Sequence, residues 1–181
     1  MTSSSSSAND NADVTTIARR VPTVLVVDDE PVTRIITDKV LQAQGFTVRS
    51  AESAEAAFAL LAEDFRPDLI LLDVVMPGMS GYEACRRLRA DPGFEHLPIV
   101  MLTSLDDQKS IDEAYFSGAT DFFTKPLNMP LLPHRVRHLL RSAMTFRQLL
   151  ESRETLIATQ KLARLGDWEL DGSGALVNCS A

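Results

Sequence analysis

Acidic, hydroxyl and amino side chains stand at the ends of four strand-like segments of this chain. They are Asp28 and Asp29 after residues 23–27, Asp73 after 69–72, Thr103 after 98–102 and Lys125 after 120–124. Short apolar runs bounded by turn residues are typical of buried strands in a parallel sheet, and ligands bind at the edge where the carboxyl ends of such strands meet. We therefore expect the five side chains to lie together at that edge and to form a site.

The three carboxylates of this group suit a hard divalent cation. Carboxylates that lie close together repel unless a cation sits between them. Mg²⁺ takes oxygen ligands and keeps several waters and phosphate oxygens. With the Lys125 ammonium and one such cation, the formal charges of the carboxylates balance. The group can then accept a phosphoryl group, with Asp73 as the nucleophile that forms an acyl phosphate and Thr103 as a hydroxyl donor.

Each of these residues also has a simpler structural role open to it. We expect one of the acids at 28–30 to cap the helix that follows. Thr103 could be an ordinary strand-end residue, and a lysine before a proline, as at Lys125, is common on surfaces. Asp73 is harder to explain in this way, because a carboxylate that closes a fully apolar strand is costly unless it has a partner. The joint pattern therefore favours a site more strongly than any one residue does.

Strand and helix patterns alternate from Val21 to about Leu140. The strands are expected at about residues 23–27, 46–50, 69–72, 98–102 and 120–124. Apolar residues three and four apart indicate helices between them, two of which lie at about 81–89 and 107–117. Five such units predict an α/β fold with a parallel sheet, right-handed crossovers and helices on both faces.

Turn residues mark the ends of these helices. Pro31 suits the first turn of the first helix, whereas Gly45 and Gly118 suit the C-terminal ends of two others. Ser53 suits the N-cap of the second helix and Asn128 that of the last one. Local chemistry therefore supports the boundaries that the apolar spacing indicates.

Length and charge limit the class of protein. A chain of 181 residues fits one compact domain with an extension. The net charge of −7 argues against a nucleic-acid-binding surface in this chain. No apolar run approaches the roughly 18 residues of a membrane helix. Cys85 and Cys179 provide no disulfide or metal framework, so we expect reduced thiols in a cytoplasmic protein.

The first 20 residues are rich in Ser, Asn and Asp. They lack the basic and apolar regions of a secretory signal. They also contain too little apolar surface to order themselves. We expect residues 1–20 to be a disordered N-terminal tail.

A long helix is predicted from Leu132 to about Leu165. Its apolar residues follow alternating steps of four and three, which define a heptad seam, and Arg153 and Gln160 interrupt that seam. The apolar positions are Leu132, Val136, Leu139, Ala143, Phe146, Leu150 and Ile157. Because one small sheet cannot bury so long a helix, we expect residues 141–165 to be a coiled-coil linker in a parallel homodimer.

The segments that carry the site residues resemble the receiver domain of bacterial two-component response regulators. They are VVDDE at 26–30, LLDVVMPGMSG at 71–81, MLTS at 101–104 and FFTKP at 122–126. The resemblance covers about Val21 to Leu140. It implies a flavodoxin-like, doubly wound sheet with strand order 2-1-3-4-5.

The resemblance implies a role for each carboxylate. Asp73 would be the phosphoacceptor, and a histidine kinase or histidine phosphotransfer protein would donate the phosphoryl group. Mg²⁺ would bind to Asp28, Asp29 and Asp73. The backbone carbonyl of Val75 would complete the protein ligands of the metal.

The resemblance also implies how the signal would leave the site. Thr103 and Lys125 would contact the phosphoryl group, and Phe122 would be the switch aromatic. The bond between Lys125 and Pro126 would be cis. The switch would repack the face formed by the fourth helix, fifth strand and fifth helix, and so control an output domain. Because Phe122 has no hydroxyl group, where many relatives carry Tyr, its signal must depend on packing alone.

Residues 160–171, QKLARLGDWELD, resemble the beginning of a PAS sensory domain. We therefore expect residues 166–181 to be the truncated start of such a domain. Proteins with a receiver, a helical linker and a PAS domain often end in a cyclic-di-GMP synthase, a cyclic-di-GMP phosphodiesterase or a histidine kinase. We expect no output activity within the residues of this chain.

Two other classes of protein remain as alternatives. Phosphatases of the haloacid dehalogenase type also form an aspartyl phosphate, but they carry a second Asp two residues after the nucleophile, where this chain has Val75. A constitutive dimerisation module with a vestigial pocket would fit the long helix, although the presence of every pocket residue argues against it. We favour a switching receiver whose only catalysis is its own phosphorylation and dephosphorylation.

Overall fold

The computed structural model describes residues 20–63, 65–104, 112–113, 115–163, 168–170 and 176–179. Residues 1–19 of the predicted tail lie outside these ranges. Most of the helix predicted at about 107–117 lies outside them as well. Residues 112–113 and 115–116 are helical, and Gly118 follows them with a φ of +89°, as expected for a residue that ends a helix.

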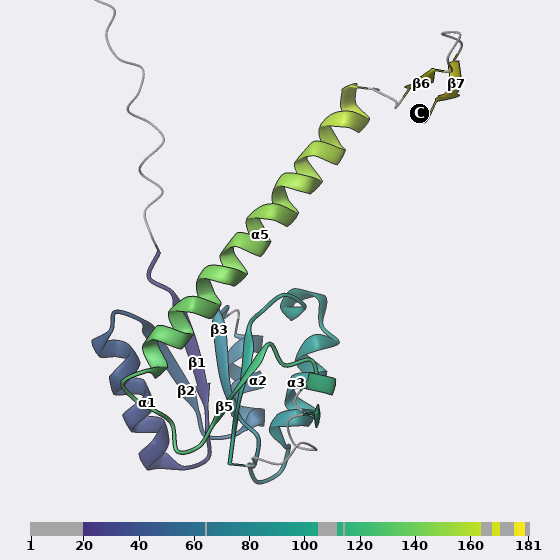
Figure 1. Cartoon of the computed structure of the whole chain (residues 1–181). Helices are drawn as coiled ribbons and strands as arrows, with labels where there is room; N and C mark the ends of the chain where they lie inside the picture. The colour runs from purple at the N-terminus through teal and green to yellow at the C-terminus, as the bar shows by residue number, and fades with distance from the viewer. Residues whose placement is uncertain are drawn as a thin grey trace, which may run out of the picture.

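Five parallel strands form the central sheet in the order β2-β1-β3-β4-β5 (Figure 1). They are β1 (Thr23–Val27), β2 (Thr47–Ala51), β3 (Leu69–Asp73), β4 (Ile99–Thr103) and β5 (Asp121–Thr124). The predicted fold class and strand order are confirmed. Every residue of β3 and β4 is buried, which explains why these two strands are apolar apart from their last residues, Asp73 and Thr103.

Helices cover both faces of this sheet. They are α1 (Pro31–Ala43), α2 (Ala54–Ala62), α3 (Gly81–Arg89), the short 3₁₀ helix η1 (Pro92–Phe94) and α5 (Leu132–Ala163). Alternate residues of each strand serve the two faces. In β1, Leu25 and Val27 pack with α2 and α3, whereas Val24 and Val26 pack with α1 and α5. The doubly wound arrangement therefore follows from the period of two along each strand.

The predicted turn residues occupy helix ends. Pro31 is the first residue of α1, and Gly45 follows that helix with a φ of +84°. The Ser53 side chain accepts a hydrogen bond from the Ala56 amide at the start of α2. Asn128 Oδ1 accepts one from the Leu131 amide in the turn before α5, so it caps that turn and not the helix, which begins at Leu132. At α1 and α2, local chemistry sets the boundaries as predicted.

The prediction that one of the acids at 28–30 caps α1 is wrong. Glu30 occupies the N-cap position, but its side chain makes no capping hydrogen bond. Asp28 instead accepts a hydrogen bond from the Glu30 amide through Oδ1, and its other oxygen contacts Lys125. The buried site holds Asp28 away from the helix end.

The long helix α5 runs well beyond the sheet (Figure 1). Leu132, Val136 and Leu140 are buried in the core on the α1 side of the sheet. The first two positions of the predicted seam therefore belong to the chain's own core. Beyond α5, β6 (Trp168–Leu170) and β7 (Leu176–Cys179) form an antiparallel pair. No described helix combines the length and the apolar character needed to cross a membrane.

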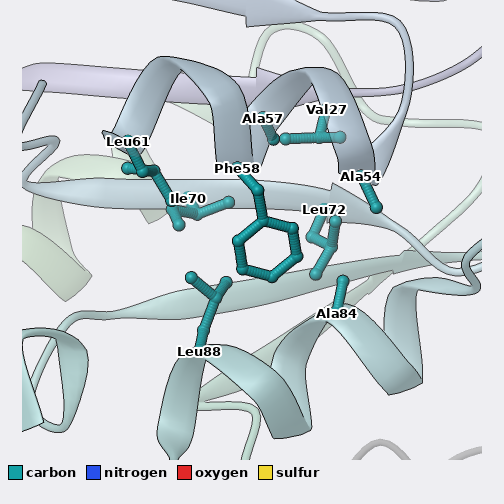
Figure 2. A pocket seen from close by; sticks show the side chains of 9 residues that line it. All are labelled: Val27, Ala54, Ala57, Phe58, Leu61, Ile70, Leu72, Ala84 and Leu88. Atoms are coloured by element: carbon teal, nitrogen blue, oxygen red, sulfur yellow. The ribbon is translucent and has the colours of Figure 1, made fainter. Parts of the chain in front are cut away.

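A small gap of about 10 Å³ lies between α2, α3 and the sheet. Figure 2 shows the Phe58 ring between the two helices, with only apolar side chains around it. The small side chains of Ala54, Ala57 and Ala84 line this gap. A space so small and so apolar has room for no ligand, so we assign it to packing.

Arg89 joins the end of α3 to two loops. Its guanidinium donates to the carbonyls of Gly118 at 2.7 Å and Phe94 at 2.8 Å, and to the Thr120 hydroxyl at 3.3 Å. We expect Arg89→Ala to lower the free energy of unfolding by about 2 kcal/mol, because hydrogen bonds from a charged donor to partly buried carbonyls are lost. Urea denaturation measures this loss.

Arg87, two residues earlier, provides the control. It pairs with Glu83 at 2.7 Å on the exposed surface of the same helix. Arg87→Ala should therefore cost less than about 0.5 kcal/mol. Equal losses in the two variants would contradict the role of Arg89 as a link between loops.

Candidate functional site

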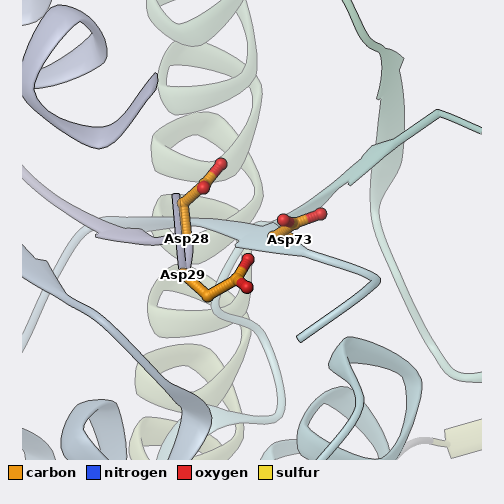
Figure 3. A group of neighbouring side chains, drawn as sticks. All are labelled: Asp28, Asp29 and Asp73. Carbon is orange, nitrogen blue, oxygen red and sulfur yellow. The ribbon is translucent and has the colours of Figure 1, made fainter. Parts of the chain in front are cut away.

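Three carboxylates converge at the carboxyl edge of the sheet. Asp28 and Asp29 follow β1, and Asp73 is the last residue of β3, the neighbouring strand. One oxygen from each residue lies within 4.8 Å of the others (Figure 3). Asp28 and Asp73 are buried, whereas Asp29 is more accessible to solvent. Such a cluster of hard oxygen donors could hold a divalent cation.

Lys125 supplies the positive charge of this cluster. Its Nζ donates to Asp28 Oδ2 at 2.9 Å and to Asp73 Oδ2 at 2.7 Å. Lys125 follows β5, and its amide donates to the Thr103 carbonyl at 2.7 Å, which fixes its position beside β4. The peptide bond between Lys125 and Pro126 is cis, the isomer that the resemblance implies. Three carboxylates and one ammonium leave two negative charges, which fits a divalent cation.

Burial and charge act in opposite directions on this pair. Burial is the largest influence on Asp73 and raises its pKa, the Lys125 ammonium opposes the rise, and the Asp28 charge adds to it. For Lys125, burial alone would lower the pKa. The hydrogen bonds and charges of Asp73 and Asp28 outweigh that effect, so the pKa of Lys125 is raised. The site therefore favours the charged form of Lys125 and disfavours the ionised form of Asp73. A second cation near Asp73 would favour its ionised form.

The remaining predicted residues surround this cluster. Thr103 is the buried last residue of β4, beside the end of β3. Phe122 lies on β5, and its ring contacts Tyr115 edge to face at a centroid distance of 5.9 Å. Val75 is exposed in the loop after β3, with its amide 3.4 Å from Asp73 Oδ1. The structure thus places Thr103 and Val75 beside the carboxylates at the carboxyl edge, whereas Phe122 lies two residues before the end of β5.

Two further residues support the site from a distance along the chain. Arg34 of α1 donates to the Asp28 carbonyl at 2.6 Å. Glu55 of α2 accepts a hydrogen bond from the Met79 amide at 3.2 Å and so holds the loop that carries Val75. Both residues are charged positions on amphipathic helices, and no local sequence signal distinguishes them from ordinary surface residues.

Gly81, the first residue of α3, approaches the backbone of Asp73. A Cβ at Gly81 would lie 2.1 Å from the Asp73 carbonyl oxygen. The Gly81 amide donates to the Val74 carbonyl at 3.0 Å. No side chain fits this approach, so the glycine lets α3 begin directly behind the nucleophile candidate.

Comparisons with known proteins identify the class that this fold and site define. The family model of the response regulator receiver domain matches residues 24–137. The chain belongs to this family.

Individual relatives agree with that assignment. The response regulator PleD of Caulobacter vibrioides is 40% identical over 126 residues, which is 70% of this chain and 28% of PleD. The phosphate regulon transcriptional regulatory protein PhoB of Rhizobium meliloti is 37% identical over 151 residues, 83% of this chain and 61% of PhoB. The crystal structure of the chemotaxis protein CheY4 of Vibrio cholerae superposes with a TM-score of 0.62 at 32% identity, and covers 66% of this chain and 98% of CheY4. This chain therefore spans less than two thirds of the length of PleD and of PhoB.

Proposed function

We propose that Asp73 accepts a phosphoryl group from the phosphohistidine of a histidine kinase or histidine phosphotransfer protein. One observation supports this most directly. The Asp73 carboxylate lies 2.7 Å from Lys125 Nζ and clusters with oxygens of Asp28 and Asp29, at the edge where a parallel sheet binds its ligands. No packing role accounts for three carboxylates and an ammonium gathered there.

The transfer itself needs little covalent chemistry from the protein. An Asp73 carboxylate oxygen attacks phosphorus, the phosphorus–nitrogen bond to the donor imidazole breaks, and a phosphorus–oxygen bond forms. The imidazole leaves with the electron pair of the broken bond and takes a proton from solvent. Lys125 Nζ and the Thr103 hydroxyl then donate to the phosphoryl oxygens. Lys125 is held for this by its existing contacts with two carboxylates.

Asp28, Asp29, Asp73 and the Val75 carbonyl are the residues that would hold Mg²⁺. When bound, Mg²⁺ neutralises charge on the transferred phosphoryl group. The donor set fits this ion because it consists of oxygen atoms alone and leaves room for water. Glu55 would keep the Val75 segment in place through its hydrogen bond to the Met79 amide.

Phe122 would carry the change from the pocket to α5. Its ring is half-buried against Tyr115, and the next residue, Phe123, packs in the core beneath α5. The Arg135 guanidinium of α5 lies 3.8 Å from the centre of the Phe123 ring. A movement of β5 at Phe122 would therefore act directly on the base of the long helix.

The domain organisation that we propose has three parts beyond the tail. Residues 21–140 are the receiver, residues 141–165 are a coiled-coil linker of a homodimer, and residues 166–181 begin a PAS domain. The linker would pass the state of the receiver to an output domain. The exposed apolar side chains on α5 beyond the core support the homodimer.

Incubation with acetyl phosphate tests the function without a cognate kinase. We expect the intact mass to increase by a single phosphate when Mg²⁺ is present, because the metal neutralises the charge of the incoming group. EDTA should prevent the adduct. The absence of an adduct under every condition would instead favour a module that signals through partner binding alone.

A further inference from the structure

The part of α5 beyond the receiver core carries an apolar stripe that Arg153 interrupts. The Phe146 ring contacts His96 of the receiver edge to face at a centroid distance of 5.3 Å and is still 47% exposed. Leu149, Leu156 and Ile157 are 66%, 63% and 41% exposed. Ala143, Leu150 and Ile157 repeat every seven residues, and so do Leu149 and Leu156. Side chains of this size exposed along one side of a helix favour contact with a second helix.

Arg153 lies in the middle of this stripe, and no acidic residue occupies the positions one helical turn away from it. The residues three and four positions away from it are Leu149, Leu150, Leu156 and Ile157. Glu154 likewise has no basic residue three or four positions away, where the chain has Leu150, Glu151, Ile157 and Ala158. Among the described residues, neither Arg153 nor Glu154 makes an ion pair. Each charge is therefore available to another helix.

The heptad positions place these two charges together in a parallel pair of helices. With Ala143, Leu150 and Ile157 at position a, Phe146 and Arg153 are at position d and Glu154 is at position e. A side chain at d packs beside positions d and e of the partner helix. Because the pair has a two-fold axis, the contact between Arg153 and the partner subunit's Glu154 would occur twice. A polar residue at a seam position sets the register of a coiled coil at some cost in stability.

The shape of the chain favours the parallel orientation. The receiver lies at one end of α5 and the β6–β7 pair at the other (Figure 1). The helix from Ala143 to Ala163 is about 30 Å long, comparable with the diameter of a small domain. An antiparallel pair would place each receiver against the partner's β6–β7 region, whereas a parallel pair keeps like ends together.

We infer that residues 143–163 of two copies form a parallel coiled coil whose register is set by Arg153 paired with Glu154 of the partner subunit. The inference refines the homodimer proposed above and shortens the predicted heptad seam, because Leu132 and Val136, the first two positions of that seam, are buried in the receiver core. It does not depend on phosphorylation of Asp73. Its failure and that of the phosphoacceptor function are therefore distinguishable.

Sedimentation equilibrium of the whole chain without phosphodonor tests the pairing of Arg153 with the partner subunit's Glu154. Arg153→Glu should raise the dimer Kd by at least about tenfold, because two glutamates then face each other across the seam. The double variant Arg153→Glu with Glu154→Arg should return to within about threefold of the original Kd. Arg141→Glu, the same charge change outside the stripe, should leave the Kd unchanged.

Three results would overturn the inference. One is an unchanged Kd in Arg153→Glu, and another is a double variant that dimerises as weakly as the single one. The third is an unmodified chain that stays monomeric at all concentrations, which would also remove the homodimer while leaving the phosphorylation result untouched.

Cross-linking tests the orientation. Ala143→Cys, in a chain that also carries Cys179→Ser, should cross-link to itself with a short bismaleimide, because position 143 meets its copy only in the parallel pair. Cys85 is buried and should not react. Arg141→Cys in the same background is the control and should cross-link poorly. Failure of the Ala143→Cys chain to cross-link while it sediments as a dimer would exclude the parallel arrangement.

Discussion

Asp73→Asn is expected to abolish the phosphate adduct completely while the receiver stays folded. The amide nitrogen and oxygen occupy the same space as the carboxylate, but the uncharged amide is not a nucleophile at neutral pH. Asp28 remains as a partner for Lys125 at 2.9 Å, so the ammonium is not left unpaired. Intact mass after incubation with acetyl phosphate and Mg²⁺ measures the result.

Asp73→Asn should not lower the melting temperature, although it abolishes phosphorylation. The pKa of Asp73 is raised in the folded chain, mainly by burial. A carboxyl group of this kind favours folding only while it is protonated, and that contribution is lost as the pH rises through its folded pKa. Without metal, Asp73→Asn should therefore melt at the same temperature as the unmodified chain or higher, and its advantage should grow as the pH rises from about 4 towards neutrality.

Asp91→Asn is the matched control for this variant. Asp91 is exposed, and its side chain accepts a hydrogen bond from the Gly93 amide, which an asparagine oxygen can also accept. The control should take up phosphate at the original rate. An adduct that persists in Asp73→Asn would refute Asp73 as the acceptor, and a large fall in its melting temperature would refute the account of its pKa.

The residues of the pocket could be predicted because the carboxyl ends of the strands in a parallel sheet lie side by side at one edge. Asp28, Asp73 and Lys125 are far apart in sequence, yet each lies at the end of a strand or directly after it, and the fold class alone brings them to one edge. The contributions of Arg34 and Glu55 could not be found in this way. Their positions depend on how α1 and α2 pack against the sheet, and a charged residue on a helix surface gives no sign of its long-range partner.

The predictions that failed or needed revision have the same physical origin. Asp28 has the residue type of a helix cap, but the ammonium at Lys125 and the Glu30 amide take its two oxygens. Leu132 and Val136 fit a heptad seam, but the sheet buries them first. Periodicity shows that a helix has an apolar side, and only the packing shows which surface covers it.

Gly81→Ala should produce the second large effect, on both phosphorylation and stability. The added methyl group would lie 2.1 Å from the Asp73 carbonyl oxygen and 2.9 Å from its carbonyl carbon. Because both neighbours are backbone atoms, either α3 or the end of β3 must move. We expect overpacking to lower the free energy of unfolding by about 3 kcal/mol. We also expect the displaced nucleophile to slow uptake of phosphate by on the order of 10²-fold.

Gly45→Ala separates this steric effect from the general cost of losing a glycine. Gly45 has a φ of +84° but nothing within 4 Å of the position of an added Cβ. Its replacement should cost about 1 kcal/mol, the penalty of a left-handed conformation, and leave the phosphorylation rate unchanged. Rates are compared at a temperature where circular dichroism shows both variants folded. If the folded Gly81→Ala chain took up phosphate as fast as Gly45→Ala, the contact between α3 and Asp73 would have no part in placing the carboxylate, and the glycine would serve stability alone.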